Sequence, residues 1–293
     1  MESRNDRWDP YFCDFSPIFS PFSPIAHHVH RYSEWPTHQD IEALKQETGV
    51  PINAGSGLPI RFVPPESATR EHLQQHYETR IYLTGEVLTR LESWHDFFNA
   101  LVWMIFPHTK AALNRIHYRA LKAMTSEKNT QRGSLRDAAT LFDESGVIVL
   151  SSQPLLIELL KRHEWKTVFW QQRNTVLSSM RFIVFGHALF EKALRPYVGM
   201  TGKGVFFQIE EVFLRQPLTE QLRMIDRWLA DFIMRRLTCN ADMSPIPVLG
   251  YPGWTKDNVA EDYYDNRQYF RPFGSKKPSR RSGDWHSDDV GYR

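Results

Sequence analysis

Histidine and carboxylate side chains stand close together at two places in the sequence, and both places could bind a metal ion or transfer protons. His95 and Asp96 are adjacent, and an imidazole beside a carboxylate can hold one divalent ion. His187 and Glu191 stand four residues apart in GHALFEK, so they share a face if this segment is helical. These four residues are the predicted catalytic group, and His95, Asp96 and His187 are the predicted metal ligands.

Each pair also has a purely structural interpretation. Asp96 follows Ser93 by three residues, so its carboxylate could cap the amino end of its own helix. Glu191 could form a surface ion pair with Lys192 or Arg195. The sequence leaves both interpretations open.

Three further residues are predicted to bind substrate. Asn99 and Lys110 stand on predicted helix faces near the first pair, and Asp143 stands in FDESG. Asp143 and Glu144 are turn-forming residues first, because an aspartate in a turn bonds its own backbone. They enter the site only if that turn faces one of the two histidines.

The His95–Asp96 pair resembles the metal-binding pair of the HD phosphohydrolases, whose site also takes a histidine upstream and an aspartate downstream. His72 or His76 and then Asp143 stand in that order. The match is incomplete, because that fold presents its ligands from helices and FDESG predicts a turn. The polar segment REHLQQHYETR around the upstream histidines also fits a solvated helix face.

Several other catalytic classes lack their sequence signature. The chain has no Gly-X-Ser-X-Gly elbow, GMTGKG lacks the spacing of a phosphate-binding P-loop and favours a flexible loop, and GHALFEK lacks the second histidine of a zinc-protease helix. The remaining hypothesis is a metal-assisted or acid–base enzyme, such as a hydrolase, with a divalent metal ion as cofactor and a small molecule as substrate. The alternative is a noncatalytic binding or scaffolding protein whose histidines and carboxylates are structural.

The composition is that of a folded globular protein. In 293 residues, 41 % are hydrophobic and 24 % charged, and the net charge is +2, which predicts neither a specific nucleic-acid partner nor an anionic membrane surface. The longest apolar stretch, around FFNALVWMIFP, is too short to span a bilayer. Two cysteines, Cys13 and Cys239, and a polar N-terminus without a leader pattern predict a cytoplasmic protein.

The elements that must position these residues are mostly helices, and the predicted fold is α+β, a mainly helical single domain with a few short strands and hairpins. Helices are expected at 40–48, 67–82, 93–107, 109–124, 154–165 and 218–237, a strand at 59–63 and a hairpin at 140–150. Residues 181–195 fit either a strand leading into a helix at Gly186 or one long helix. Residues 245–254, rich in proline and glycine, predict an extended loop.

Four ordered blocks carry a family resemblance. They are WHDFFNALVW with FPHTKAALN, RDAATLFDESG, FGHALFEKALRPYVGMTGKG, and PIPVLGYPGW with YYDNRQYFRP. On these blocks the chain resembles the bacterial domain of unknown function 3025, which implies a bacterial setting but no activity. The predicted organisation is a proline-rich irregular arm over 1–59 that packs on the domain, the family domain over 60–272, and a disordered polar tail over 273–293.

Overall fold

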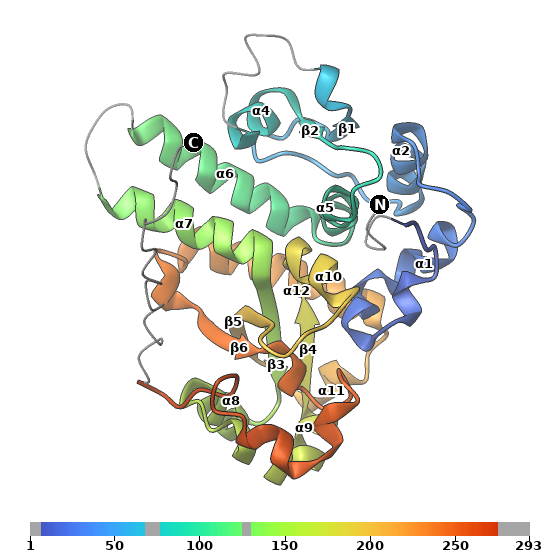
Figure 1. The fold of residues 1–293 in the computed structure, drawn as a ribbon. Helices are drawn as coiled ribbons and strands as arrows, with labels where there is room; N and C mark the ends of the chain where they lie inside the picture. Colours follow the sequence, from blue (N-terminus) through green and yellow to red (C-terminus); the bar gives the residue numbers. More distant parts are fainter. Residues whose placement is uncertain (1–6, 68–76, 125–129, 275–293) are drawn as a thin grey trace, which may run out of the picture.

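The computed structural model describes residues 7–67, 77–124 and 130–274, and it has the α+β fold, mostly helical, that the sequence predicts (Figure 1). His72, His76 and nearly all of the predicted tail lie outside these residues. The helices are α1 (Ser23–Val29), α2 (His38–Glu47), α4 (Tyr77–Thr84), α5 (Trp94–Ile105), α6 (Pro107–Met124), α7 (Thr130–Ser145), α8 (Pro154–Lys161), α9 (Arg173–Ser179), α10 (His187–Ala193), α11 (Glu211–Leu214) and α12 (Leu218–Arg235). Short single-turn helices, among them η2 (Pro17–Phe22), connect them. The helices expected near 40–48, 93–107, 109–124, 154–165 and 218–237 are therefore confirmed.

The strands form two small sheets. They are β1 (Arg61–Val63), β2 (Glu86–Leu88), β3 (Gly146–Ser151), β4 (Met180–Val184), β5 (Thr201–Gln208) and β6 (Ser244–Pro247). β1 and β2 pair in parallel, and the other four lie in the order β4-β3-β5-β6. In the larger sheet β3 is antiparallel to β4 and parallel to β5, so the chain's most apolar strand lies inside the sheet, with every residue buried.

The predicted hairpin at 140–150 is wrong. Residues up to Ser145 continue helix α7, and the Ser145 hydroxyl donates to the Leu141 carbonyl at 2.7 Å. Only the second half of the segment is a strand, and its partners β4 and β5 follow much later in the chain. The apolar run from Val147 to Leu150 therefore reflects burial in the sheet interior rather than a local hairpin.

Two predicted loops are strands. GMTGKG leads into β5, where an ideal Cβ on Gly202 would lie 2.4 Å from the Val147 side chain, so this glycine allows close packing against β3. The proline-rich segment after Met243 begins as β6, which pairs only with β5. Proline is compatible with such an edge strand, because its missing N–H is not needed for a second neighbour.

The segment 181–195 is a strand followed by a helix, the first of its two predicted interpretations. β4 ends at Val184, and α10 begins at His187 after Gly186. Four of the five residues of β4 are buried, and Arg181 is the exception. Because both faces of the strand are buried, its apolar residues do not alternate with polar ones, and periodicity alone did not separate strand from helix.

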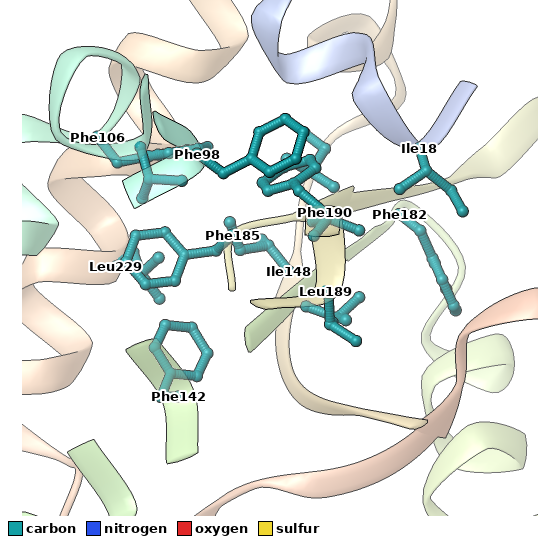
Figure 2. Close-up of a cluster of buried hydrophobic side chains, with 14 of the residues drawn as sticks. Ile18, Phe98, Phe106, Phe142, Ile148, Phe182, Phe185, Leu189, Phe190 and Leu229 are labelled. Carbon is teal, nitrogen blue, oxygen red and sulfur yellow. The ribbon is translucent and has the colours of Figure 1, made fainter. Parts of the chain in front are cut away.

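The aromatic residues of the N-terminal segment belong to the main core. Phe19 and Phe22 of η2 are fully buried, and their rings pack against Phe98 of α5 and Phe190 of α10, with the Phe22 and Phe190 centroids 4.4 Å apart. Figure 2 shows Phe98, Phe190 and Ile18 converging above the strands. This cluster fixes α5 against α10, and the same two helices carry His95 and His187.

Helix α6 is anchored at its amino end by a residue of α12. The buried Asp226 carboxylate accepts hydrogen bonds from the backbone N–H groups of His108 and Thr109, at 3.0 and 2.8 Å. It also bonds His108 Nδ1 at 2.8 Å and the Thr109 hydroxyl at 2.7 Å. Helix α12 packs against α6, the position from which Asp226 reaches this helix end. Among the helices in the described ranges, none has the length and apolar character that a membrane crossing requires.

The His108–Asp226 contact predicts a pH-dependent contribution to stability. The hydrogen bond to Asp226 raises the pKa of His108, with Arg227 opposing, and Glu47 and Arg223 are the other charged groups around the same cavity. A raised folded-state pKa gives stability that is complete below the unfolded value of about 6.5 and is lost as the pH rises through the folded value. His108→Gln should therefore cost more at pH 5.5 than at pH 8.5, by less than about 1 kcal/mol, because the His108 side chain is half exposed. Urea unfolding of both proteins at each pH measures this, and a cost that grows with pH would contradict it.

Candidate functional site

A cavity of about 710 Å³ opens among helices α4, α5, α6, α7 and α10. Polar side chains from all five helices line it, and Pro65, Leu88 and Leu121 form its apolar wall. Figure 1 shows α6 and α7 side by side, with α4 above and the end of α5 beside them. The cavity is thus a trough between two antiparallel helices, with α5 and α10 at one end.

The sheet brings two distant segments together at that end. Because β3 and β4 pair antiparallel, with Val147 opposite Val184, the end of α7 lies beside the start of α10. The backbones approach so closely that an ideal Cβ on Gly186 would lie 2.4 Å from the Ser145 Cα. No side chain fits there, so glycine is required. The residues on either side of this contact, Glu144 and His187, consequently face one cavity.

Two histidines and one carboxylate meet at this end of the cavity. His95 Nε2 lies 3.1 Å from His187 Nε2, and Glu144 Oε1 lies 3.6 Å from His187 Nε2. One ligand atom from each of the three residues falls within 4.8 Å of the others. Two imidazole nitrogens and a carboxylate oxygen are a donor set that zinc and iron accept. The side chains therefore fit a divalent transition-metal ion.

A carboxylate also lies near the Nδ1 atom of each imidazole. Glu191 Oε2 accepts a hydrogen bond from His95 Nδ1 at 2.9 Å, which leaves His95 Nε2 directed at the other histidine. Asp143 Oδ2 lies 3.8 Å from His187 Nδ1, a buried nitrogen that has no hydrogen-bond partner among the residues the structure describes. Metal-binding histidines usually have such a carboxylate on the second nitrogen, because it orients the ring and increases its basicity.

The charge states of the site follow from burial and pairing. Burial lowers the pKa of His187 to about 4, so this imidazole is neutral at pH 7, as metal binding requires. Burial raises the pKa of Glu144. The hydrogen bond between His95 and Glu191 raises the pKa of the imidazole and lowers that of the carboxylate.

A largely buried ion pair lies beside the cavity, which its Asp143 member lines. Lys110 Nζ donates to both carboxylate oxygens of Asp143, at 2.6 and 2.8 Å, and to Asn99 Oδ1 at 2.9 Å. Burial by itself would raise the pKa of Asp143, but the Lys110 ammonium and then His187 hold it below its usual value. The Asn99 amide donates to the Tyr77 hydroxyl at 3.1 Å, so that hydroxyl can give its own proton to a ligand.

Asp96 is held away from the histidines. Its carboxylate accepts from the Arg90 guanidinium at two positions, both at 2.9 Å, and from the Arg90 backbone N–H at 2.7 Å. Burial by itself would raise the pKa of Asp96, but the contacts with Arg90 outweigh burial and hold the pKa below its ordinary value. Asp96 lines the cavity yet is absent from the group of three ligand residues. The predicted cap is half formed, because Ser93 Oγ accepts from the Asp96 backbone N–H at 3.3 Å while the Asp96 side chain turns to Arg90.

Comparison with known proteins agrees with the sequence blocks. Residues 60–273 match the profile of the family described as protein of unknown function DUF3025. The chain belongs to the DUF3025 family. No curated protein and no solved structure matches it. Membership in this family therefore assigns no activity to the chain.

Within this DUF3025 chain, the structure brings together most of the residues singled out by sequence. His95, His187 and Asp143 converge, while Glu191 contacts His95 rather than His187 or a neighbouring lysine or arginine. Glu144 takes the place expected of Asp96 in the ligand group.

His117 and Arg136 are among the cavity residues of the DUF3025 chain that were not singled out by sequence. Helical spacing could have found them. Arg136, Thr140 and Glu144 stand at intervals of four in α7, and all three line the cavity. The predicted hairpin turn at FDESG concealed that shared helix face.

Proposed function

We propose that this chain is a metal-assisted hydrolase whose divalent ion is bound by His95, His187 and Glu144. The observation that carries the proposal is the convergence of these three ligand atoms within 4.8 Å at one end of a cavity of about 710 Å³. Glu191 on His95 supports it, because a carboxylate behind a histidine is the usual second contact of a metal site. The bacterial and cytoplasmic setting stays a prediction of the resemblance.

A bound divalent ion would polarise a substrate carbonyl or phosphoryl oxygen and lower the pKa of a water molecule. The chain supplies the other parts. The Tyr77 hydroxyl, which accepts a hydrogen bond from the Asn99 amide, would donate its own proton to a bound molecule. Lys110 compensates the Asp143 carboxylate, which stands behind His187. These groups would bind and orient the reacting part of the substrate.

Metal analysis of the purified, untagged protein tests the proposal. After incubation with zinc, manganese or iron and removal of excess metal, plasma mass spectrometry should find close to one equivalent per chain. His27→Ala, which removes an exposed histidine of α1, should leave that content unchanged. Hydrolysis of phosphoester and amide substrates should then depend on the metal. Protein that remains metal-free with all three ions would overturn the proposal.

Glu191→Gln should weaken metal binding about tenfold or more while leaving the three ligands in place. The amide can still accept a hydrogen bond from His95 Nδ1, but it lacks the charge that increases the basicity of the ring. Competition with a metal-sensitive chelator dye measures the change. An affinity within twofold of wild type would show that Glu191 does not support a metal ligand.

The alternative function, a noncatalytic binding protein, is favoured by a different observation. Lys110, Asn99 and Asp143 satisfy one another, and Asp96 is satisfied by Arg90, as expected of residues that stabilise a fold. A metal-free protein that binds small molecules in this cavity without turnover would support that function.

A further inference from the structure

The end of the cavity remote from the two histidines of the ligand group carries a second pair of basic side chains. His117 of α6 and Arg136 of α7 both line it. His117 is only 6 % exposed. Neither side chain makes a hydrogen bond or ion pair with another residue in the described parts of the chain. The charge of His117 acts on the Asp143 carboxylate, but no hydrogen bond within the described residues occupies its ring nitrogens. A buried imidazole that borders a cavity with free ring nitrogens can bind a ligand there.

The helix register places these two side chains opposite each other. Lys110 of α6 contacts Asp143 of α7, and the two helices are antiparallel neighbours. His117 follows Lys110 by seven residues, and Arg136 precedes Asp143 by seven. Seven residues are close to two helical turns, so each residue returns to the face of its helix that lines the trough. His117 and Arg136 therefore face each other across it.

Arg136 lies far enough from the ligand group to bind a different part of the same molecule. Eight residues separate it from Glu144 on the same face of α7, which corresponds to about 12 Å along the helix axis. That distance is the length of a compact metabolite, and a cavity of about 710 Å³ accommodates one.

The acidic residues near this end have hydrogen-bond partners, and the charge of Asp143 is compensated by Lys110. Glu78 accepts from the Asn114 amide at 2.8 Å, and Asp143 is bound by Lys110. The basic groups that line this end are the Arg136 guanidinium, which carries five donors in a fork that matches an oxyanion, and the His117 imidazole.

We propose that His117 and Arg136 bind an anionic group of the substrate, a carboxylate or a phosphate, while the bond to be cleaved lies beside His95, Glu144 and His187. The substrate class is then a small anionic molecule. This assignment rests on the proposed function for the reaction, but anion binding itself does not require the metal.

Calorimetric titration of the metal-free, full-length protein at low ionic strength tests the assignment, with inorganic phosphate and acetate as separate probes. At least one probe should bind, and Arg136→Gln should weaken it about tenfold or more. Arg119→Gln is the matched control, because Arg119 is an exposed residue of α6 that does not line the cavity. It should change the affinity less than threefold.

The outcomes separate the two anions and the two proposals. Binding of phosphate alone assigns a phosphate group, binding of acetate alone assigns a carboxylate, and binding of both assigns an oxyanion site that accepts either. Binding of neither probe, or equal weakening by Arg136→Gln and Arg119→Gln, overturns the assignment. Because the assay contains no metal, failure of the metal site would leave this result unchanged, and failure here would leave the metal site in place.

Discussion

Lys110→Met should destabilise the protein by about 3–5 kcal/mol, because it leaves the Asp143 carboxylate in a largely buried position without its cation. The Lys110 side chain is 5 % exposed and that of Asp143 16 % exposed. Methionine reproduces the length of the aliphatic stem but cannot donate to Asp143 or to Asn99. The midpoint of urea unfolding, followed by circular dichroism, measures the loss.

A double variant separates the missing charge from the missing packing. Lys110→Met combined with Asp143→Leu removes both charges, and a buried ion pair replaced by apolar residues is often near neutral for stability. The double variant should therefore lose less stability than Lys110→Met alone, with the residual cost coming from the unpaired Asn99 oxygen. Equal losses in the two proteins would show that Lys110 acts through packing.

Removing one metal ligand should weaken metal binding about a hundredfold or more. The binding free energy of a zinc site, of order 10–16 kcal/mol, divides into about 2.5–4 kcal/mol for each of about four ligands. His95→Ala, His187→Ala and Glu144→Gln each remove one member of the group of three. Chelator competition gives the affinity, and the unchanged far-ultraviolet circular dichroism of Glu144→Gln confirms that the fold is intact.

Asp96→Asn is the informative control for that prediction. The sequence places Asp96 among the ligands, whereas its carboxylate is bound to Arg90. We therefore expect Asp96→Asn to keep metal affinity within about threefold of wild type and to cost stability through the lost Arg90 contact. Loss of metal from Asp96→Asn, with Glu144→Gln unaffected, would support the ligand set predicted from the sequence, which includes Asp96, and contradict the proposed set, which includes Glu144.

Local patterns were sufficient for most of the helices. The apolar spacing of α12 and the amino-terminal serine of α5 depend on interactions within one helix, so they are visible in a single segment. The same holds for Pro154 at the first position of α8. Local patterns failed at FDESG, since the residues that favour turns there continue a helix whose end is decided by the sheet beside it.

The sequence by itself determined the mostly helical α+β fold, the family, and the histidines and carboxylates that are candidates for chemistry. Only the tertiary structure decided which of them meet. His95 and His187 are 92 residues apart in the chain, and their contact depends on the pairing of β3 with β4 and on the packing of α5 against α10. Glu144 lies beside these two histidines and Asp96 does not, because long-range packing sets the direction of each side chain. The spacing of residues within one segment does not contain that information.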